Sequence, residues 1–140
     1  MNSRLIFVKG YCYYYGSLKN LSPCLKNRMG VYYYMRNIVI NSVEKVFVLP
    51  VDEIIFIQAL ASYSAFNMSN GSRILSSQSL AVYEDLLKEE HFFRAHRSYL
   101  VNLAFITEIV KTGDVVLLNG TVLPIAKESI KQLSKALTEI

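Results

Sequence analysis

The chain has 140 residues, of which 52% are hydrophobic, so it is long enough to form one domain whose core needs no disulfide or metal. Its longest apolar runs, such as residues 54–57 and 115–118, are far shorter than the roughly 20 residues of a membrane-spanning helix. The apolar run at residues 5–8 lacks the length and the small-residue cleavage site of a secretory signal. We therefore expect a cytoplasmic protein that does not associate with membranes.

The formal net charge is +4, but the charged residues are unevenly distributed. Residues 1–36 contain six basic residues and no acidic one, whereas residues 37–140 contain nine basic and eleven acidic residues, a net charge of −2. Net charge affects solubility and association with polyanions. Because the larger part of the chain is slightly acidic, any affinity for nucleic acid must come from local groups of residues.

Residues 1–36 differ in composition from the rest, since they also hold seven of the ten tyrosines. We interpret them as an N-terminal extension, and several alternatives remain open. The extension could be an aromatic and basic arm that binds nucleic acid, an added strand pair, a disordered tail, or sequence ahead of a true start at Met29 or Met35. Cys12 and Cys24 lie here without a second ligand pair or a nearby histidine, so free thiols are expected instead of a zinc site.

After residue 36, short segments rich in β-branched and aromatic residues alternate with turn signals. Asn70-Gly71 and Asn119-Gly120 favour two-residue hairpin turns, and Thr112-Gly113-Asp114 marks a further reversal. We therefore predict a mainly antiparallel all-β domain over residues 37–140. Eight strands are predicted, at residues 37–40, 45–49, 54–60, 63–68, 73–76, 105–111, 114–118 and 121–125.

Two segments have the periodicity of amphipathic helices. Within residues 79–90, apolar residues such as Leu80 and Tyr83 fall on one helical face after a plausible cap at Ser79. Within residues 127–140, apolar residues recur at helical spacing while lysines occupy the other faces. We predict a short internal helix and a C-terminal helix.

No group of residues typical of catalysis is evident in residues 37–140. The chain lacks a paired glycine-rich phosphate loop, and His91 and His96 do not have the spacing of two metal ligands on one helical face. Three acidic pairs lie beside turns or on the solvent-facing side of the predicted helix, where a solvated charge is usual: Asp52-Glu53, Glu84-Asp85 and Glu89-Glu90. We expect no enzymatic activity, no cofactor and no metal site.

One segment, residues 92–103 with the sequence FFRAHRSYLVNL, places polar donors between apolar anchors. Its apolar residues can fix the backbone in the core, which leaves the polar side chains to project or to stabilise a turn. Arginine matches the guanine O6 and N7 atoms, asparagine and histidine can contact other base edges, and serine can hold a phosphate. Three structural alternatives remain open: Arg94 pairs with a carboxylate, His96 is a satisfied core histidine, or Asn102 caps its own turn.

The segment FFRAHRSYLVNL resembles the most recognisable stretch of the LytTR DNA-binding domain, the output module of the LytR/AlgR class of bacterial response regulators. Before it come LPVDEIIFIQALASY, an Asn-Gly hairpin and SLAVYEDLL, and after it come AFITEI, DVVLLNGTVLPIA and KESIKQL, all in family order. The resemblance covers about residues 37–140. It implies an elongated fold of about ten strands in consecutive small sheets, with short helices.

The resemblance also implies that loops at one edge of the domain enter successive major grooves of DNA. The first implied contact lies after residues 54–60, where Ser62, Tyr63 and Ser64 occupy the family positions, although some relatives have a larger donor in place of Ser64. The second is the pair His96-Arg97. Arg97 is the best candidate for a contact with a base edge.

Arg94 and Ser98 are expected to meet phosphates or to brace this second loop. The third implied contact is Lys127, where many relatives carry serine followed by arginine and this chain has Ala126-Lys127. A point charge then replaces a bidentate fork, which can relax base selectivity, and a helix start favours phosphate. Lys131 follows on the same predicted helix. The expected DNA-binding residues are thus Ser62, Tyr63, Ser64, Arg94, His96, Arg97, Ser98, Asn102, Lys127 and Lys131.

The function implied by this resemblance is sequence-specific binding of double-stranded DNA by a bacterial transcription regulator, with two copies, a possible homodimer, on direct repeats in a promoter. Most relatives carry a receiver domain, and residues 1–36 are too few for one, so phosphorylation-driven dimerisation is not expected within this polypeptide. The alternative is an interaction module that keeps the fold but titrates a regulatory protein partner without binding specific DNA.

Overall fold

The computed structural model describes residues 4–8, 11–17, 20–26, 32–34 and 36–139, with side chains from Arg36 onward. In the first 35 residues four strands form an antiparallel sheet in the order β1-β2-β3-β4. Their bounds are Arg4–Val8 (β1), Tyr11–Ser17 (β2), Asn20–Lys26 (β3) and Tyr32–Tyr34 (β4). The expectation that Cys12 and Cys24 are free thiols concerns side chains outside the described residues.

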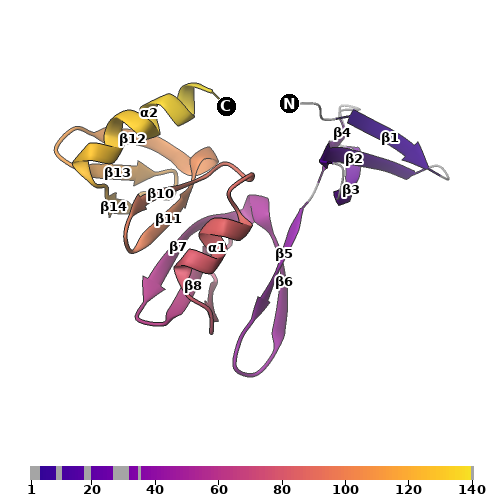
Figure 1. Ribbon diagram of the computed structural model, residues 1–140, viewed down its shortest axis with the longest axis horizontal. Coiled ribbons are helices and arrows are strands. Elements are labelled where there is room, and N and C mark those ends of the chain that lie inside the picture. The colour runs from indigo at the N-terminus through magenta and orange to yellow at the C-terminus, as the bar shows by residue number, and fades with distance from the viewer. Residues whose placement is uncertain (1–3, 9–10, 18–19, 27–31, 35, 140) are drawn as a thin grey trace.

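From residue 37 onward, ten strands form three small antiparallel sheets, which confirms the predicted all-β class (Figure 1). The sheets are the hairpin β5-β6, a five-stranded sheet in the order β10-β11-β7-β8-β9, and a three-stranded sheet in the order β12-β13-β14. The strands are β5 (Asn37–Asn41), β6 (Val46–Pro50), β7 (Ile54–Leu60), β8 (Tyr63–Met68), β9 (Arg73–Ser76), β10 (Phe92–His96), β11 (Tyr99–Asn102), β12 (Ile106–Val110), β13 (Asp114–Leu117) and β14 (Val122–Pro124).

Strand β7 lies at the centre of the five-stranded sheet and is buried on both faces. Ile57 belongs to a core cluster that includes residues of β5, β6 and the helix α1 (Leu80–Leu86). Phe56, its neighbour on β7, belongs to a second cluster with β13, β14 and the C-terminal helix α2 (Ile130–Thr138). Because consecutive strand residues face opposite sides, the five-stranded sheet is the middle layer between these two sets of elements.

Strands β10 and β11 were not predicted as strands, because the sequence analysis took this segment for a loop fixed by apolar anchors. They form a hairpin whose turn is Arg97-Ser98, and a bulge at Ala95 shifts the register. Leu100 faces the first core cluster and Val101 the second, so β11 lacks the polar and apolar alternation that marks a half-buried strand. The turn also lacks the glycine, asparagine or proline that usually signals a hairpin.

Both predicted helices are present and both are shorter than predicted. Helix α1 ends at Leu86, because the chain turns through residues 87–91 to reach β10, and His91 has a positive φ of 51°. The C-terminal helix α2 is preceded by a 3₁₀ turn at Lys127–Ser129 and ends at Thr138. The apolar periodicity therefore located the helices but not their ends.

Tyr83 fixes α1 on the sheet. Its side chain is fully buried, its ring meets the Phe66 ring edge-on at a centroid distance of 4.7 Å, and its hydroxyl is hydrogen-bonded to Ser76 Oγ on β9. Edge-on aromatic pairs stabilise beyond the area that they bury. The position of every α1 side chain along the sheet therefore depends on this tyrosine.

Tyr83→Phe keeps the ring and removes the hydroxyl, which leaves the buried Ser76 hydroxyl without that partner. We expect the free energy of unfolding to fall by about 1 kcal/mol in urea denaturation, the usual net contribution of one hydrogen bond, because Ser76 Oγ keeps its bonds with the Asn41 carbonyl and the Gln78 N–H. The control is Tyr63→Phe, since Tyr63 is about half exposed and should change stability by less than about 0.5 kcal/mol. Equal effects of the two substitutions would contradict this account.

Candidate nucleic-acid interface

Three separate chain segments meet at one edge of the domain, on the left in Figure 1. They are the β7–β8 turn, the β10–β11 turn, and the start of the 3₁₀ turn at Lys127. Backbone hydrogen bonds join them, because the Ala59 N–H donates to the Ser98 carbonyl at 2.8 Å and the Ala126 N–H to the Ala95 carbonyl at 3.0 Å. The structure therefore brings together the three segments that the sequence analysis expected to contact DNA.

Arg97 occupies the apex of the β10–β11 turn. Its residue is exposed, and no hydrogen bond or ion pair joins its guanidinium to another side chain among residues 36–139. Five N–H donors in a planar fork are thus free to meet a ligand. The backbone beneath this side chain is held by the pairing of β11 with β7.

His96 precedes Arg97 and is partly buried. Its Nδ1 accepts a hydrogen bond from the Ser98 N–H at 3.2 Å, and its ring lies 5.9 Å from the Tyr99 ring between centroids. A neutral imidazole that accepts at Nδ1 carries its proton at Nε2, so this hydrogen-bond pattern makes Nε2 the donor of the ring. Ser98 is partly buried, and its amide stabilises the turn.

Arg94 faces the side of the sheet where α1 lies, and its guanidinium is engaged within the protein. Nε donates to the His96 carbonyl at 3.0 Å, Nη2 donates to the Arg97 carbonyl, and Nη1 pairs with Glu84 of α1. This geometry agrees with two of the expectations for Arg94, namely that it pairs with a carboxylate and that it braces the turn. Glu84 was expected to be a solvated charge, and its pairing with Arg94 was not predicted, since nothing in the sequence links it to a residue ten positions later.

The β7–β8 turn presents Ser62 and Tyr63 to solvent, whereas Ser64 points into the domain. The turn has only two residues, and Ala61 adopts a positive φ of 56°. Ser64 is fully buried, and its hydroxyl donates to the Gln78 carbonyl at 2.7 Å. The expectation that Ser64 contacts DNA does not match this placement, because strand alternation turns it away from the surface that Tyr63 occupies.

Asn102 is likewise buried, and both ends of its side-chain amide are satisfied within the protein. Its Nδ2 donates to the Ile54 carbonyl at 2.9 Å, and its Oδ1 accepts from the Ala104 N–H at 3.0 Å. This placement agrees with the alternative that Asn102 caps its own turn, and it does not match the expectation of a DNA contact. Its role is to join the end of β11 to the start of β7.

Lys127 and Lys131 are both exposed, and both belong to the C-terminal helical segment. Glu128 lies next to Lys127, so the local charge is not purely basic. Arg73 Nη2 on β9 donates to Gln58 Oε1 at 3.2 Å, and Gln58 Nε2 lies 3.5 Å from the Tyr99 hydroxyl. These two contacts link β9 through Gln58 of β7 to Tyr99 of β11, whose ring lies beside His96. No motif in the sequence predicted them.

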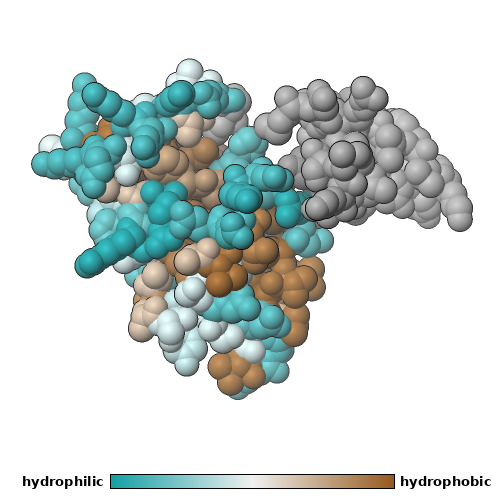
Figure 2. Space-filling view, in the orientation of Figure 1, coloured by the Kyte–Doolittle hydropathy of each residue, from teal (hydrophilic) through white to brown (hydrophobic). Residues whose placement is uncertain are grey.

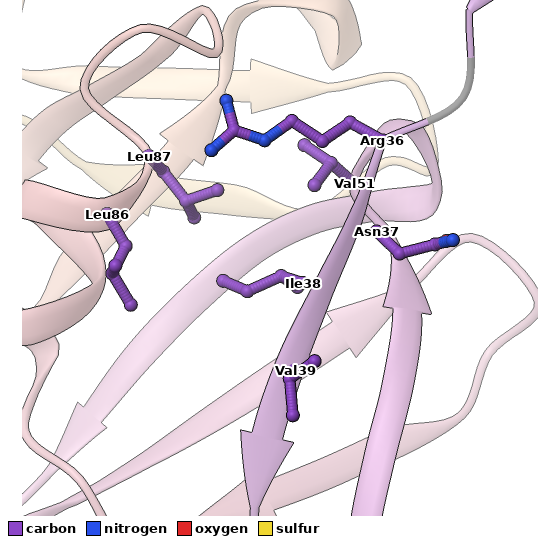
Figure 3. A pocket seen from close by; sticks show the side chains of 7 residues that line it. All are labelled: Arg36, Asn37, Ile38, Val39, Val51, Leu86 and Leu87. Atoms are coloured by element: carbon purple, nitrogen blue, oxygen red, sulfur yellow. The ribbon is translucent and has the colours of Figure 1, made fainter. Parts of the chain in front are cut away.

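The exposed apolar side chains of the domain lie largely away from this edge. Figure 2 shows hydrophobic surface over the hairpin β5-β6, where Val39, Val43, Val46 and Val48 are exposed. A pocket of about 250 Å³ lies between β5 and the end of α1 (Figure 3). It is lined by Arg36, Asn37, Ile38, Val39, Val51, Leu86 and Leu87, none of which belongs to the three segments.

Two further observations bear on the kind of site. In the described ranges, no three His, Cys, Asp or Glu residues are grouped closely enough to hold a metal ion. No helix in the described part of the chain is both long and apolar enough to cross a membrane.

The chain is similar to known proteins both in sequence and in fold. A family model described as the LytTr DNA-binding domain matches residues 44–138. A solved LytTr DNA-binding domain from Bacillus cereus is similar in fold, with a TM-score of 0.61 and 21% sequence identity, over 72% of this chain and 95% of that one. No curated protein matches the sequence. Because the family model covers well over half of its residues, the chain belongs to the LytTR family of DNA-binding domains, which implies DNA binding in the regulation of transcription.

Proposed function

We propose that the chain binds double-stranded DNA sequence-specifically, with the β10–β11 and β7–β8 turns entering the major groove. The observation that supports this most is the placement of Arg97, which is exposed and unpaired within residues 36–139 at the apex of a hairpin whose base is buried. A free guanidinium on a rigid turn matches the O6 and N7 acceptors of guanine. Beside it, the Nε2 donor of His96 can meet a further base acceptor or a phosphate.

The other exposed residues of this edge have supporting roles in the proposal. Ser62 and Tyr63 contact DNA from the β7–β8 turn, while Lys127 and Lys131 contact phosphates. Phosphate contacts set position and add affinity without sequence information. Ser64, Asn102 and Arg94 are left out of this set, because their polar atoms are engaged inside the protein.

The proposal also covers assembly and organisation. We infer that residues 37–140 are the DNA-binding domain and residues 1–36 an extension, a division that the family match to residues 44–138 supports. Two copies, a possible homodimer, are proposed to occupy direct repeats in promoter DNA in the bacterial cytoplasm. A regulatory protein partner remains the second candidate, and the selection experiment below distinguishes it.

The test is selection of bound fragments from sheared genomic DNA by the purified chain at near-physiological salt. We expect enrichment of a repeated motif. Affinity depends steeply on salt for protein–DNA complexes, so the salt concentration is held fixed. A well-folded chain that enriches no motif but co-purifies as a stable heteromer would overturn the proposal in favour of an interaction module.

Arg97→Ala should remove discrimination at one base position of the selected motif. The expected loss is about 1–3 kcal/mol at that position, because one bidentate contact with a base is removed. The measurement compares affinities for the selected site and for the three substitutions at each position. The control is Lys45→Ala, an exposed cation at the far end of the β5-β6 hairpin, which should leave the motif intact. Equal weakening on every sequence would show that Arg97 does not contact a base.

Lys127→Gln should weaken binding to all sequences to a similar extent. If Lys127 neutralises one phosphate, the slope of the logarithm of affinity against the logarithm of salt falls by about 1. Lys45→Gln, at the far end of the β5-β6 hairpin, serves as control and should leave the slope unchanged. A change of base preference with an unchanged slope would argue against a phosphate contact.

Asn102→Ala should lower stability without changing the preferred motif. Removal of the amide leaves the Ile54 carbonyl and the Ala104 N–H unmatched, which costs about 1–3 kcal/mol in urea denaturation. Asn37→Ala on the exposed side of β5 is the control. Loss of discrimination by an Asn102→Ala protein of normal stability would restore Asn102 as a DNA contact.

A further inference from the structure

We propose that Glu84 and Arg94 form a positioning pair that holds the β10–β11 turn in the conformation in which Arg97 meets its base. The inference rests on the proposed function of Arg97 and deepens it. Neither residue of the pair touches DNA in this account. Their effect on sequence discrimination is exerted through the backbone of the turn.

The contacts of Arg94 all converge on this turn. Its Nε and Nη2 donate to the carbonyls of His96 and Arg97, which are consecutive residues at the apex. Its Nη1 pairs with the Glu84 carboxylate of α1. One planar guanidinium therefore fixes two successive peptide groups relative to a helix, which a flexible ammonium with a single charged nitrogen does not reproduce.

The turn needs such support because its sequence does not specify its conformation. Arg97-Ser98 lacks the glycine, asparagine or aspartate that two-residue hairpin turns prefer, and the bulge at Ala95 interrupts the pairing of β10 just before it. The hairpin also lies at the edge of the sheet, because β10 is the outer strand and pairs with a neighbour on one side only. Without Arg94, the turn would keep the pairing of His96 with Tyr99, the bond from the Ser98 N–H to the His96 ring, and the bond from the Ala59 N–H to the Ser98 carbonyl. Arg94 adds the side-chain bonds to the carbonyls of His96 and Arg97.

The anchor of the pair is well fixed. Glu84 follows Tyr83, the fully buried residue that holds α1 on the sheet through its hydrogen bond to Ser76. The bulge also matters, because Arg94 pairs opposite Leu100 on the α1 side whereas His96 pairs opposite Tyr99 near the second core cluster. Arg94 therefore faces α1, whereas His96, which follows the bulge, lies on the side of Tyr99 and the second core cluster.

The same geometry argues against Arg94 as a phosphate contact. Its charge is compensated by Glu84, and a carboxylate held beside DNA repels phosphates. Its side chain is 29% exposed, and the three contacts engage all three of its nitrogens. A positioning role and a phosphate contact predict opposite results for Arg94→Lys, which keeps the charge, and for Glu84→Gln, which removes the opposing charge.

The experiment uses the full chain with Arg94→Lys, Glu84→Gln and the double variant, and Asp85→Asn as control. Asp85 neighbours Glu84, is exposed, and pairs with Lys88 instead of Arg94. Discrimination is measured at the base position that Arg97→Ala affects, and amide hydrogen exchange is measured in the free protein at Ser98, whose N–H is bonded to the His96 ring. Urea denaturation confirms that each variant is folded.

A positioning pair predicts roughly tenfold loss of discrimination for Arg94→Lys despite the retained charge, and a smaller loss in the same direction for Glu84→Gln. The double variant should be no worse than Arg94→Lys alone, since both substitutions break one unit. Exchange at Ser98 should accelerate, and Asp85→Asn should match the original protein in every measurement.

Full discrimination in Arg94→Lys, or a uniform rise of affinity for all sequences in Glu84→Gln, would overturn the positioning role and assign Arg94 to phosphate. Unchanged amide exchange at Ser98 would also overturn it. If the original chain selects no DNA sequence, the proposed function fails, and the exchange measurement still decides whether Glu84 and Arg94 hold the turn.

Discussion

Burial of β7 on both faces is the constraint on which the rest of the structure depends. Ile57 packs among β5, β6 and α1, while Phe56 packs against β13, β14 and α2. A shift of one residue in the pairing of β7 would exchange these faces and expose both clusters, so its register with β8 and β11 is strongly fixed. Because β7 is central, the turns at the ends of its neighbours lie together at one edge of the sheet.

The polar residues near this edge divide according to the face on which they lie. Arg97, Tyr63 and Lys127 are exposed and available to a ligand, whereas Ser64 and Asn102 are buried and stabilise the backbone that presents them. Buried polar groups are almost always hydrogen-bonded, and both of these are. Only some of the polar residues near this edge are therefore available to contact DNA. The buried ones hold the backbone that positions the exposed side chains.

Sequence reasoning predicted the class of fold, eight of the strands from residue 37 onward, and both helices, since alternation and turn signals act locally. It did not predict β10 and β11, because Arg94 and His96 interrupt the apolar residues, a bulge breaks the strand period, and the Arg97-Ser98 turn lacks the Asn-Gly signal of the other hairpins. The resemblance pointed to Arg97 and to the three segments that meet at the edge. The pairing of Glu84 with Arg94, and the inward direction of Ser64, depend on a bulge and on the strand register, which are properties of the assembled sheets.

The central claim is that Arg97 contacts a guanine from the major groove, and interference by methylation tests it most directly. A selected site is methylated sparsely at guanine N7, which lies in the major groove, and at adenine N3, which lies in the minor groove. The account predicts that one N7 methyl group blocks binding by the original chain and has far less effect on Arg97→Ala. Interference from adenine N3 alone, or the same N7 interference in both proteins, would contradict it.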